Sequence, residues 1–200
     1  MNKKSELRER KKISSRKAIL DGGLEVFATI GYERSTIADI AKASGRSVGS
    51  LYNHCGDKYS IYGSLVSQFL VELRDVLNHT RENAASLEAF VMGAFCACSE
   101  LLAKQSKMQK LINNSATTFR QFINSEETFI GIVNDLERDL QKAVDAGIMP
   151  SLPVKLMTIA MMSTSLDFFS NDIDDNGPQA KAEFLGQLFL GGIERFSMLK

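Results

Sequence analysis

The chain has 200 residues and a mass of 22.1 kDa, enough for one medium domain or a small domain fused to a larger one. Apolar residues make up 44% of it, which supports a packed core and excludes wholesale disorder. No uncharged stretch exceeds 13 residues (Tyr59–Val71), and Ala89–Ser99 and Leu156–Leu166 have 11 residues each, whereas a membrane-spanning helix needs about 20. We therefore expect no transmembrane segment and no membrane partner. The basic first residues lead into no apolar run, so no secretory signal is expected.

The net charge of zero hides an asymmetry along the chain. Residues 1–58 carry 12 Lys or Arg against 7 Asp or Glu, while residues 59–200 carry 12 against 17. This segregation indicates that one end meets a polyanion, although a solubilising basic tail would look the same. The three cysteines form no CxxC pair, which favours reduced thiols and a cytoplasmic location.

The first expected helix covers residues 14–30, where apolar residues recur at helical spacings. Gly22 and Gly23 lie inside it and each costs roughly 0.5–1 kcal/mol relative to alanine. Gly31 is expected to end this helix as a left-handed cap. In front of it, Lys3–Lys17 forms a basic arm that either touches a DNA backbone or minor groove or stays disordered without DNA.

Two short helices are expected next, on either side of a glycine turn. Thr36 is the expected N-cap of the first, and Asp39 three residues on completes a capping-box pattern. That helix stops before Gly45, and Ser47 is expected to cap the second, over residues 48–54. The pattern is that of a helix-turn-helix, although a plain helical bundle with a glycine turn remains an alternative on spacing alone.

The rest of the chain is also predicted to be helical. The expected helices are a long one that starts at Asp57 or its neighbour and ends near residue 80, and others over residues 86–103, 107–115, 125–146, 152–170 and 179–198. An acidic, turn-rich loop is expected at residues 171–178. Strand periodicity is lacking, so the fold class is all-α.

Residues 16–65 resemble the tetracycline-repressor (TetR-type) family of transcriptional regulators. The positions that carry the resemblance are Ile19, Leu20, Leu24–Phe27, Gly31, Tyr32, Ser35–Ala41, Gly45, Ser47, Gly49–Tyr52 and Lys58. The resemblance implies a three-helix head with a helix-turn-helix at residues 1–58. It also implies a larger helical domain for effector binding and dimerisation at residues 59–200.

In such proteins the third helix enters the major groove of double-stranded DNA. Matched position by position, the DNA-binding candidates are Thr36, Arg46, Ser47, Val48, Gly49, Ser50, Tyr52, Asn53, His54 and Lys58. Several have a structural alternative: Thr36 and Ser47 are caps in any case, and Tyr52 could simply pack. Lys58 is the strongest candidate for a phosphate contact, as a cation at a helix start where local capping does not call for one.

The larger half carries 11 of the 12 phenylalanines, which gives it an adaptable apolar interior. The resemblance implies a pocket there for an apolar or aromatic small-molecule effector. The candidate lining residues, each of which could equally be plain core, are Phe90, Phe95, Phe119, Phe122, Phe129 and Met161. The last two helices carry broad apolar faces, and the resemblance implies a homodimer through them.

These features predict a ligand-responsive repressor that binds a palindromic operator as a homodimer and is released by its effector. The alternatives are a helical interaction module, or an enzyme, with a vestigial DNA-binding head. Against an enzyme, the two histidines lie far from the cysteines in sequence, and the chain shows no nucleophile elbow, phosphate loop or metal-spaced cluster. We therefore expect no catalytic residues, metal or cofactor.

Overall fold

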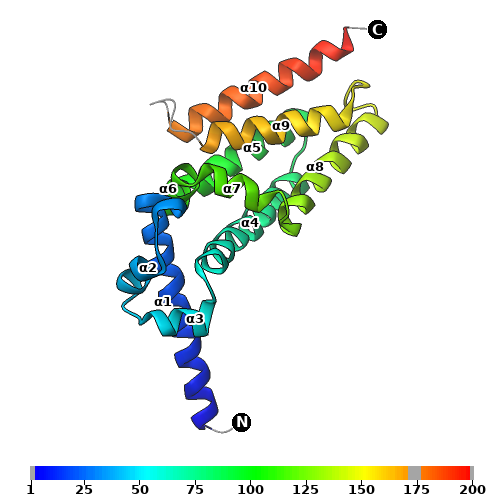
Figure 1. Ribbon diagram of the computed structural model, residues 1–200. Helices are drawn as coiled ribbons and strands as arrows, with labels where there is room; N and C mark the ends of the chain where they lie inside the picture. The colour runs from blue at the N-terminus through cyan, green and yellow to red at the C-terminus, as the bar shows by residue number, and fades with distance from the viewer. Residues whose placement is uncertain (1–2, 171–176, 199–200) are drawn as a thin grey trace. The chain divides into compact units, whose positions relative to one another are not determined.

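The computed structural model describes residues 3–170 and 177–198, and every regular element in these ranges is an α-helix (Figure 1). The predicted all-α class is thus confirmed. Contacts divide the chain into two compact units: residues up to Phe69 with Lys107–Phe122, and Leu70–Ser106 with the chain from Ile123 onward. None of the described helices is both long and apolar enough to cross a bilayer.

The first unit is built around a three-helix head. Its helices are α1 (Lys3–Arg34), α2 (Ile37–Ser44), α3 (Val48–Cys55), the first part of α4 (Lys58–Glu82), α6 (Ser106–Asn114) and α7 (Ala116–Ile123). The largest fully buried side chains of the three head helices are Ile19, Phe27, Ile40 and Leu51, and the first part of α4 adds Ile61 and Tyr62. Helix α7 was not expected from the sequence.

Helix α1 differs from its prediction at both ends. It begins at Lys3, so the basic arm is helical and continuous with the rest of α1. It also passes Gly31, which has φ 79° and ψ 164°, and resumes for one more turn to Arg34. Gly31 therefore kinks the helix where a cap was expected, and the backbone carbonyl of Asn114 lies against its α-carbon.

The two glycines inside α1 are unfavourable for helix formation, but they have a role in packing. A β-carbon on Gly22 would come within 2.7 Å of the Ser44 backbone nitrogen on α2. One on Gly23 would come within 2.7 Å of a methyl group of Ile61 on α4. Since real β-carbons do not approach other atoms that closely, the two glycines let α2 and α4 pack directly on α1.

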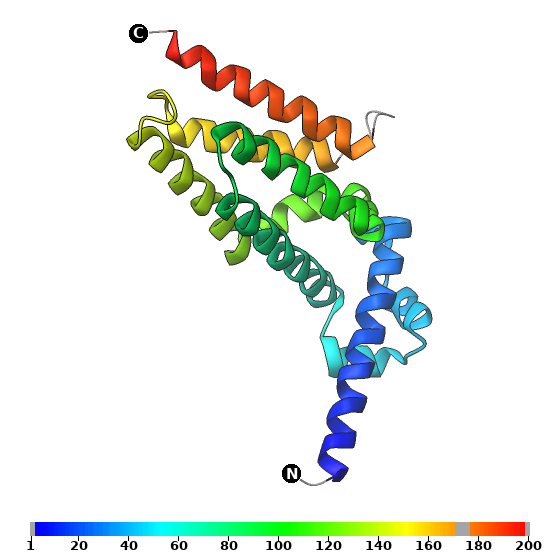
Figure 2. The same ribbon diagram turned by 180° about the vertical axis from the view of Figure 1, so that it is seen from behind.

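The second unit consists of the remainder of α4 with α5 (Leu87–Lys104), α8 (Glu127–Asp145), α9 (Val154–Ser170) and α10 (Gly177–Ser197). Helices α5 and α10 run side by side (Figure 2). Gly186 leaves room for Met92, and the rings of Phe95 and Phe189 stack with centroids 5.7 Å apart. The expected helices from residue 86 onward are confirmed with ends shifted by no more than two residues.

The predicted loop at residues 171–178 is described only in part. Gly177 is the first residue of α10, so the helix begins two residues earlier than the sequence indicated. The expectation for residues 171–176 lies outside the described residues.

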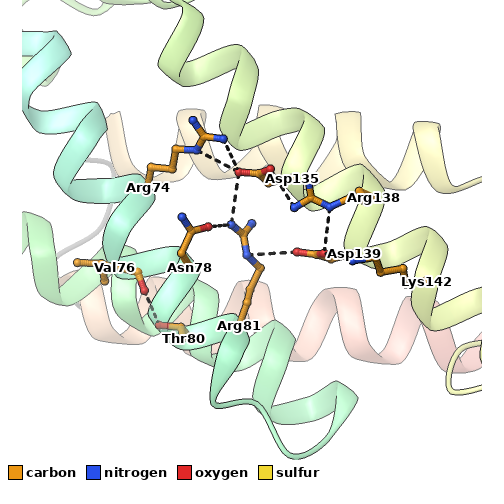
Figure 3. Close-up of polar contacts among 9 residues, drawn as sticks. All are labelled: Arg74, Val76, Asn78, Thr80, Arg81, Asp135, Arg138, Asp139 and Lys142. Carbon is orange, nitrogen blue, oxygen red and sulfur yellow. Dashed lines mark hydrogen bonds and ion pairs between the residues drawn. The ribbon is translucent and has the colours of Figure 1, made fainter.

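An ion-pair network joins α4 to α8 within the second unit (Figure 3). Asp135 on α8 is 6% exposed and accepts two hydrogen bonds from Arg74, at 2.9 and 3.0 Å. Arg138 lies 3.0 Å from its other oxygen, and Arg81 reaches both Asp135 and Asp139, at 3.7 and 3.2 Å. Burial tends to raise the pKa of Asp135, but Arg74 and the other two guanidinium groups outweigh it and lower the pKa overall.

Candidate DNA-binding site

Helix α2 begins with the capping box that the sequence predicted. The hydroxyl oxygen of Thr36 accepts a hydrogen bond from the Asp39 backbone N–H, and Asp39 accepts one from the Thr36 N–H at 2.9 Å. Hydrogen bonds from the Thr36 hydroxyl and N–H lower the pKa of the Asp39 carboxyl group. The helix ends at Gly45, whose φ of 63° and ψ of 29° are those of a left-handed cap.

Helix α3 is anchored through one face and exposed on the other. Ser47 caps it as predicted, accepting a hydrogen bond from the Ser50 N–H at 3.2 Å. Leu51 and Cys55 are buried against the head. The opposite face is open to solvent and displays the predicted base-reading and backbone residues Val48 (38% exposed), Gly49, Tyr52 (56% exposed) and Asn53, with Arg46 and Ser47 next to them.

The remaining DNA-binding candidates lie in the same unit with less exposure. Thr36 is exposed at the start of α2, while Ser50, His54 and Lys58 are half-buried. The head thus brings all ten candidates together on three short segments around α3. Whether each one contacts DNA stays a prediction.

Lys58 has a structural role that sequence reasoning missed. Its Nζ donates to the carbonyl oxygens of Tyr32 at 2.8 Å and Ser35 at 2.9 Å, and lies 4.1 Å from the centre of the Tyr32 ring. Tyr32 lies in the last turn of α1 and Ser35 directly follows that helix, and a cation is favoured at a helix C-terminus. These partners are distant in sequence, so local capping of α4 does not explain the cation; Lys58 instead ties the start of α4 to the end of α1.

We expect Lys58→Met to lower the free energy of unfolding by about 2 kcal/mol, because two charge-assisted hydrogen bonds are lost. Urea denaturation followed by far-UV circular dichroism measures the change. Lys42→Met, which removes an exposed cation from α2, is the matched control and should change stability by less than about 0.5 kcal/mol. Equal effects from the two variants would contradict the role assigned to Lys58.

Two further sets of contacts position the head, and no sequence motif predicted either of them. Arg16 donates to the His54 carbonyl at 3.1 Å and to the Ser64 hydroxyl at 3.2 Å, so α1 holds the C-terminal end of α3. On the other side, Asn114 donates to the Ala28 carbonyl at 2.7 Å and Ser115 accepts from the Tyr32 N–H at 2.8 Å. These contacts join residues 38 to 86 positions apart.

The six candidate effector residues are divided between the two units. Phe119 and Phe122 belong to the first, where Phe122 meets the ring edges of Tyr59 and Tyr62. The other four belong to the second: Phe90 is half-buried, and Phe95, Phe129 and Met161 are buried. Phe95 is engaged with Phe189, as a core residue would be. A role in effector binding stays a prediction for all six.

Comparison with known proteins supports the reading of the head. Residues 19–65 match the family described as bacterial regulatory proteins, tetR family. The HTH-type transcriptional repressor KstR2 of Rhodococcus jostii RHA1 is 30% identical over 132 residues, which cover 61% of this chain and 65% of that protein. The repressor AcnR of Corynebacterium glutamicum is 32% identical over 68 residues, or 34% of this chain and 36% of AcnR. The matches thus span less than two thirds of these relatives.

Solved structures extend the likeness in fold to most of the chain. The fatty acid degradation regulator FadR of Bacillus halodurans has a TM-score of 0.78 at 22% identity, covering 89% of this chain and 95% of its own. FadR of Bacillus subtilis, solved in complex with stearoyl-CoA, has a TM-score of 0.77 at 22% identity and covers 88% and 98%. At this identity the likeness concerns the fold alone.

Proposed function

Because this chain belongs to the TetR family of bacterial regulatory proteins, we propose that it is a ligand-responsive transcriptional repressor. It binds a palindromic operator as a homodimer and is released by a small-molecule effector, in the cytoplasm. The observation that carries the proposal is the exposed face of α3, held by Leu51 and Cys55 beneath it and by the cap at Ser47. A helix displayed in this way can enter the major groove.

Fluorescence anisotropy on labelled DNA from the region upstream of its own gene tests the DNA-binding part. Val48→Asp places a negative charge on the exposed face of α3 and is expected to weaken operator binding by about a hundredfold or more, through repulsion from phosphates. An aspartate at the first position of a helix favours folding. Ile148→Asp makes the same charge change at an exposed aliphatic residue of the second unit and should leave binding unchanged.

Competitor-resistant binding at two subunits per site supports the repressor. Weak binding that is equal for all sequences and unaffected by Val48→Asp would instead favour a helical module with a vestigial head.

We propose a long-chain acyl-CoA as the effector class. The proposal draws on the fold shared with a regulator solved with stearoyl-CoA and on the apolar side chains of this chain's larger half. Adding stearoyl-CoA to the protein–operator complex should weaken operator binding by about 5- to 150-fold, as a coupling of 1–3 kcal/mol would. Coenzyme A alone is the control. Unchanged operator affinity with stearoyl-CoA would refute this effector class and leave the DNA-binding proposal intact.

The dimer is proposed to form through α9 and α10, which carry apolar side chains that the single chain leaves exposed. These are Leu156 and Ile159 on α9, and Phe184 (56% exposed) and Leu188 (51% exposed) on α10. On α10, Gly191 and Gly192 face open space, so a second helix could approach closely there.

Leu188→Glu is expected to convert the dimer to a monomer and to abolish binding at two subunits per operator. A charge buried at the centre of an interface without a partner costs several kcal/mol. Sedimentation equilibrium measures the mass, and Ile148→Glu, outside α9 and α10, is the control. An unchanged dimer would place the interface elsewhere.

A further inference from the structure

We infer that the N-terminal helical arm of α1 is a second DNA-contacting surface, which grips backbone phosphates flanking the site read by α3 through a row formed by Arg8, Lys12 and Arg16. The inference rests on the proposed DNA-binding function. The basic composition of the arm does not by itself identify its partner or the face that makes contact; the inference names backbone phosphates as the partner and the row as the contacting face.

The arm is a regular helix with no packing of its own. Residues 5–14 are all exposed, and α1 runs without a break from Lys3 to its kink at Gly31. Figures 1 and 2 both show the N-terminal turns of α1 extending past α3. At 1.5 Å per residue, Arg8 lies about 12 Å beyond Arg16 along the helix axis. That reach exceeds the depth of a major groove, about 8.5 Å.

One side of the arm is basic and lies on the side of α3. Arg8, Lys12 and Arg16 follow one another at four-residue steps, so they fall within an arc of about 80°. Arg16 shows where this row faces, because its guanidinium group bonds the carbonyl of His54 near the C-terminal end of α3. When α3 lies in the major groove, this row of cations therefore lies next to the DNA backbone that flanks the site.

The charges of this row are not matched within the chain. Among the described residues, neither Arg8 nor Lys12 has an ion-pair partner, unlike Lys17, which meets Asp21 at 2.8 Å on another face. Like charges at four-residue spacing destabilise a helix by a few tenths of a kcal/mol per pair. A line of phosphates removes this repulsion, whereas solvent only screens it.

The test compares two double variants of the full-length protein that lose the same charge. Arg8→Gln with Lys12→Gln removes the two cations of the row that have no ion-pair partner and keeps Arg16; Arg10→Gln with Lys17→Gln removes two cations from the opposite face of α1. Binding to the operator with its flanks and to a random duplex is measured by anisotropy between about 50 and 200 mM salt. We expect the first variant to flatten the slope of log affinity against log salt by about two, and the control by less than one.

Hydroxyl-radical footprinting on the operator gives a second readout. The first double variant should lose protection of the flanking phosphates and keep protection of the site read by α3, while the control keeps both. Equal slopes and equal footprints for the two double variants would overturn the role of the arm. If the protein prefers no operator over random DNA, the repressor proposal fails, whereas the two slopes on the random duplex still decide whether the arm touches DNA.

Discussion

Replacing Gly31 with alanine is expected to lower the free energy of unfolding of the first unit by about 3 kcal/mol. Its φ of 79° and ψ of 164° belong to a backbone region that is essentially restricted to glycine, at a cost of about 1–3 kcal/mol for other residues. The added β-carbon would also run into the backbone carbonyl oxygen of Asn114. A carbonyl in the backbone cannot rotate aside as a flexible side chain can, so α6 itself would have to move.

Gly49→Ala is the matched control for this substitution. Gly49 lies within α3, and a β-carbon there would meet nothing within 4 Å. Alanine is the better helix former, so the control is expected to be neutral or up to about 1 kcal/mol more stable. Urea denaturation of both variants, followed by circular dichroism, decides the matter. Two variants of equal stability would mean that the kink at Gly31 carries no strain for alanine.

Asp135→Asn is expected to destabilise the second unit by about 3 kcal/mol. The carboxylate is nearly buried and is the meeting point of Arg74, Arg81 and Arg138. Removing one side of a buried ion pair leaves the opposite charges without compensation, which costs about 3–5 kcal/mol in dry interiors. Arg74 and Arg138 retain contact with water, with 39% and 55% of their side chains exposed, so the expected cost is at the lower end.

Two comparisons separate the network from a general effect of charge. Asp145→Asn removes an exposed carboxylate from the end of the same helix and should change stability by less than about 0.5 kcal/mol. Arg74→Met should cost less than Asp135→Asn, because Asp135 keeps its other two arginines. A loss from Arg74→Met as large as that from Asp135→Asn would contradict the central position of Asp135.

The same carboxylate predicts how stability depends on pH. Since the pKa of Asp135 is lower in the folded protein than its ordinary value, its contribution is complete above about pH 4 and is lost as pH falls through the folded pKa. The difference in stability between the wild-type protein and Asp135→Asn should therefore shrink as pH falls below about 4. A difference that stays constant over that range would show that folding does not lower the pKa of Asp135.

Local sequence determined the caps and turns of the head. Thr36, Asp39, Gly45 and Ser47 each act through backbone groups within about four residues, so their spacing is sufficient to predict them. The same holds for Asp57, which accepts from the Ser60 N–H at 2.7 Å and opens α4 as expected. The recognisable order of these signals is also what made the family resemblance visible.

Helix α7 shows where local signals were insufficient. Its eight residues include Thr117 and Thr118, which are poor helix formers, and the hydroxyl of Ser115, directly before it, accepts from the Tyr32 N–H far away in sequence. The helix is held by burial of Phe119 and Ile123 and by the hydrogen bond of 2.6 Å from Thr118 to Glu33. Those partners lie in parts of the chain that only folding brings together.

The sequence by itself therefore determined the helical class, the bounds of every helix beyond residue 86 except α7 to within two residues, and the order of the helices in the head, because these depend on periodicity and on neighbours along the chain. The contacts that individual side chains make with distant parts of the chain depend on the tertiary structure alone. Lys58 holds the end of α1 through carbonyls 23 and 26 residues away. Arg16 faces α3 across 38 residues, which gives the basic arm its direction. Phenylalanine side chains are equally suited to a packed core and to a ligand pocket. Their number in the sequence therefore indicated an apolar interior, whereas their positions within it follow only from the tertiary structure.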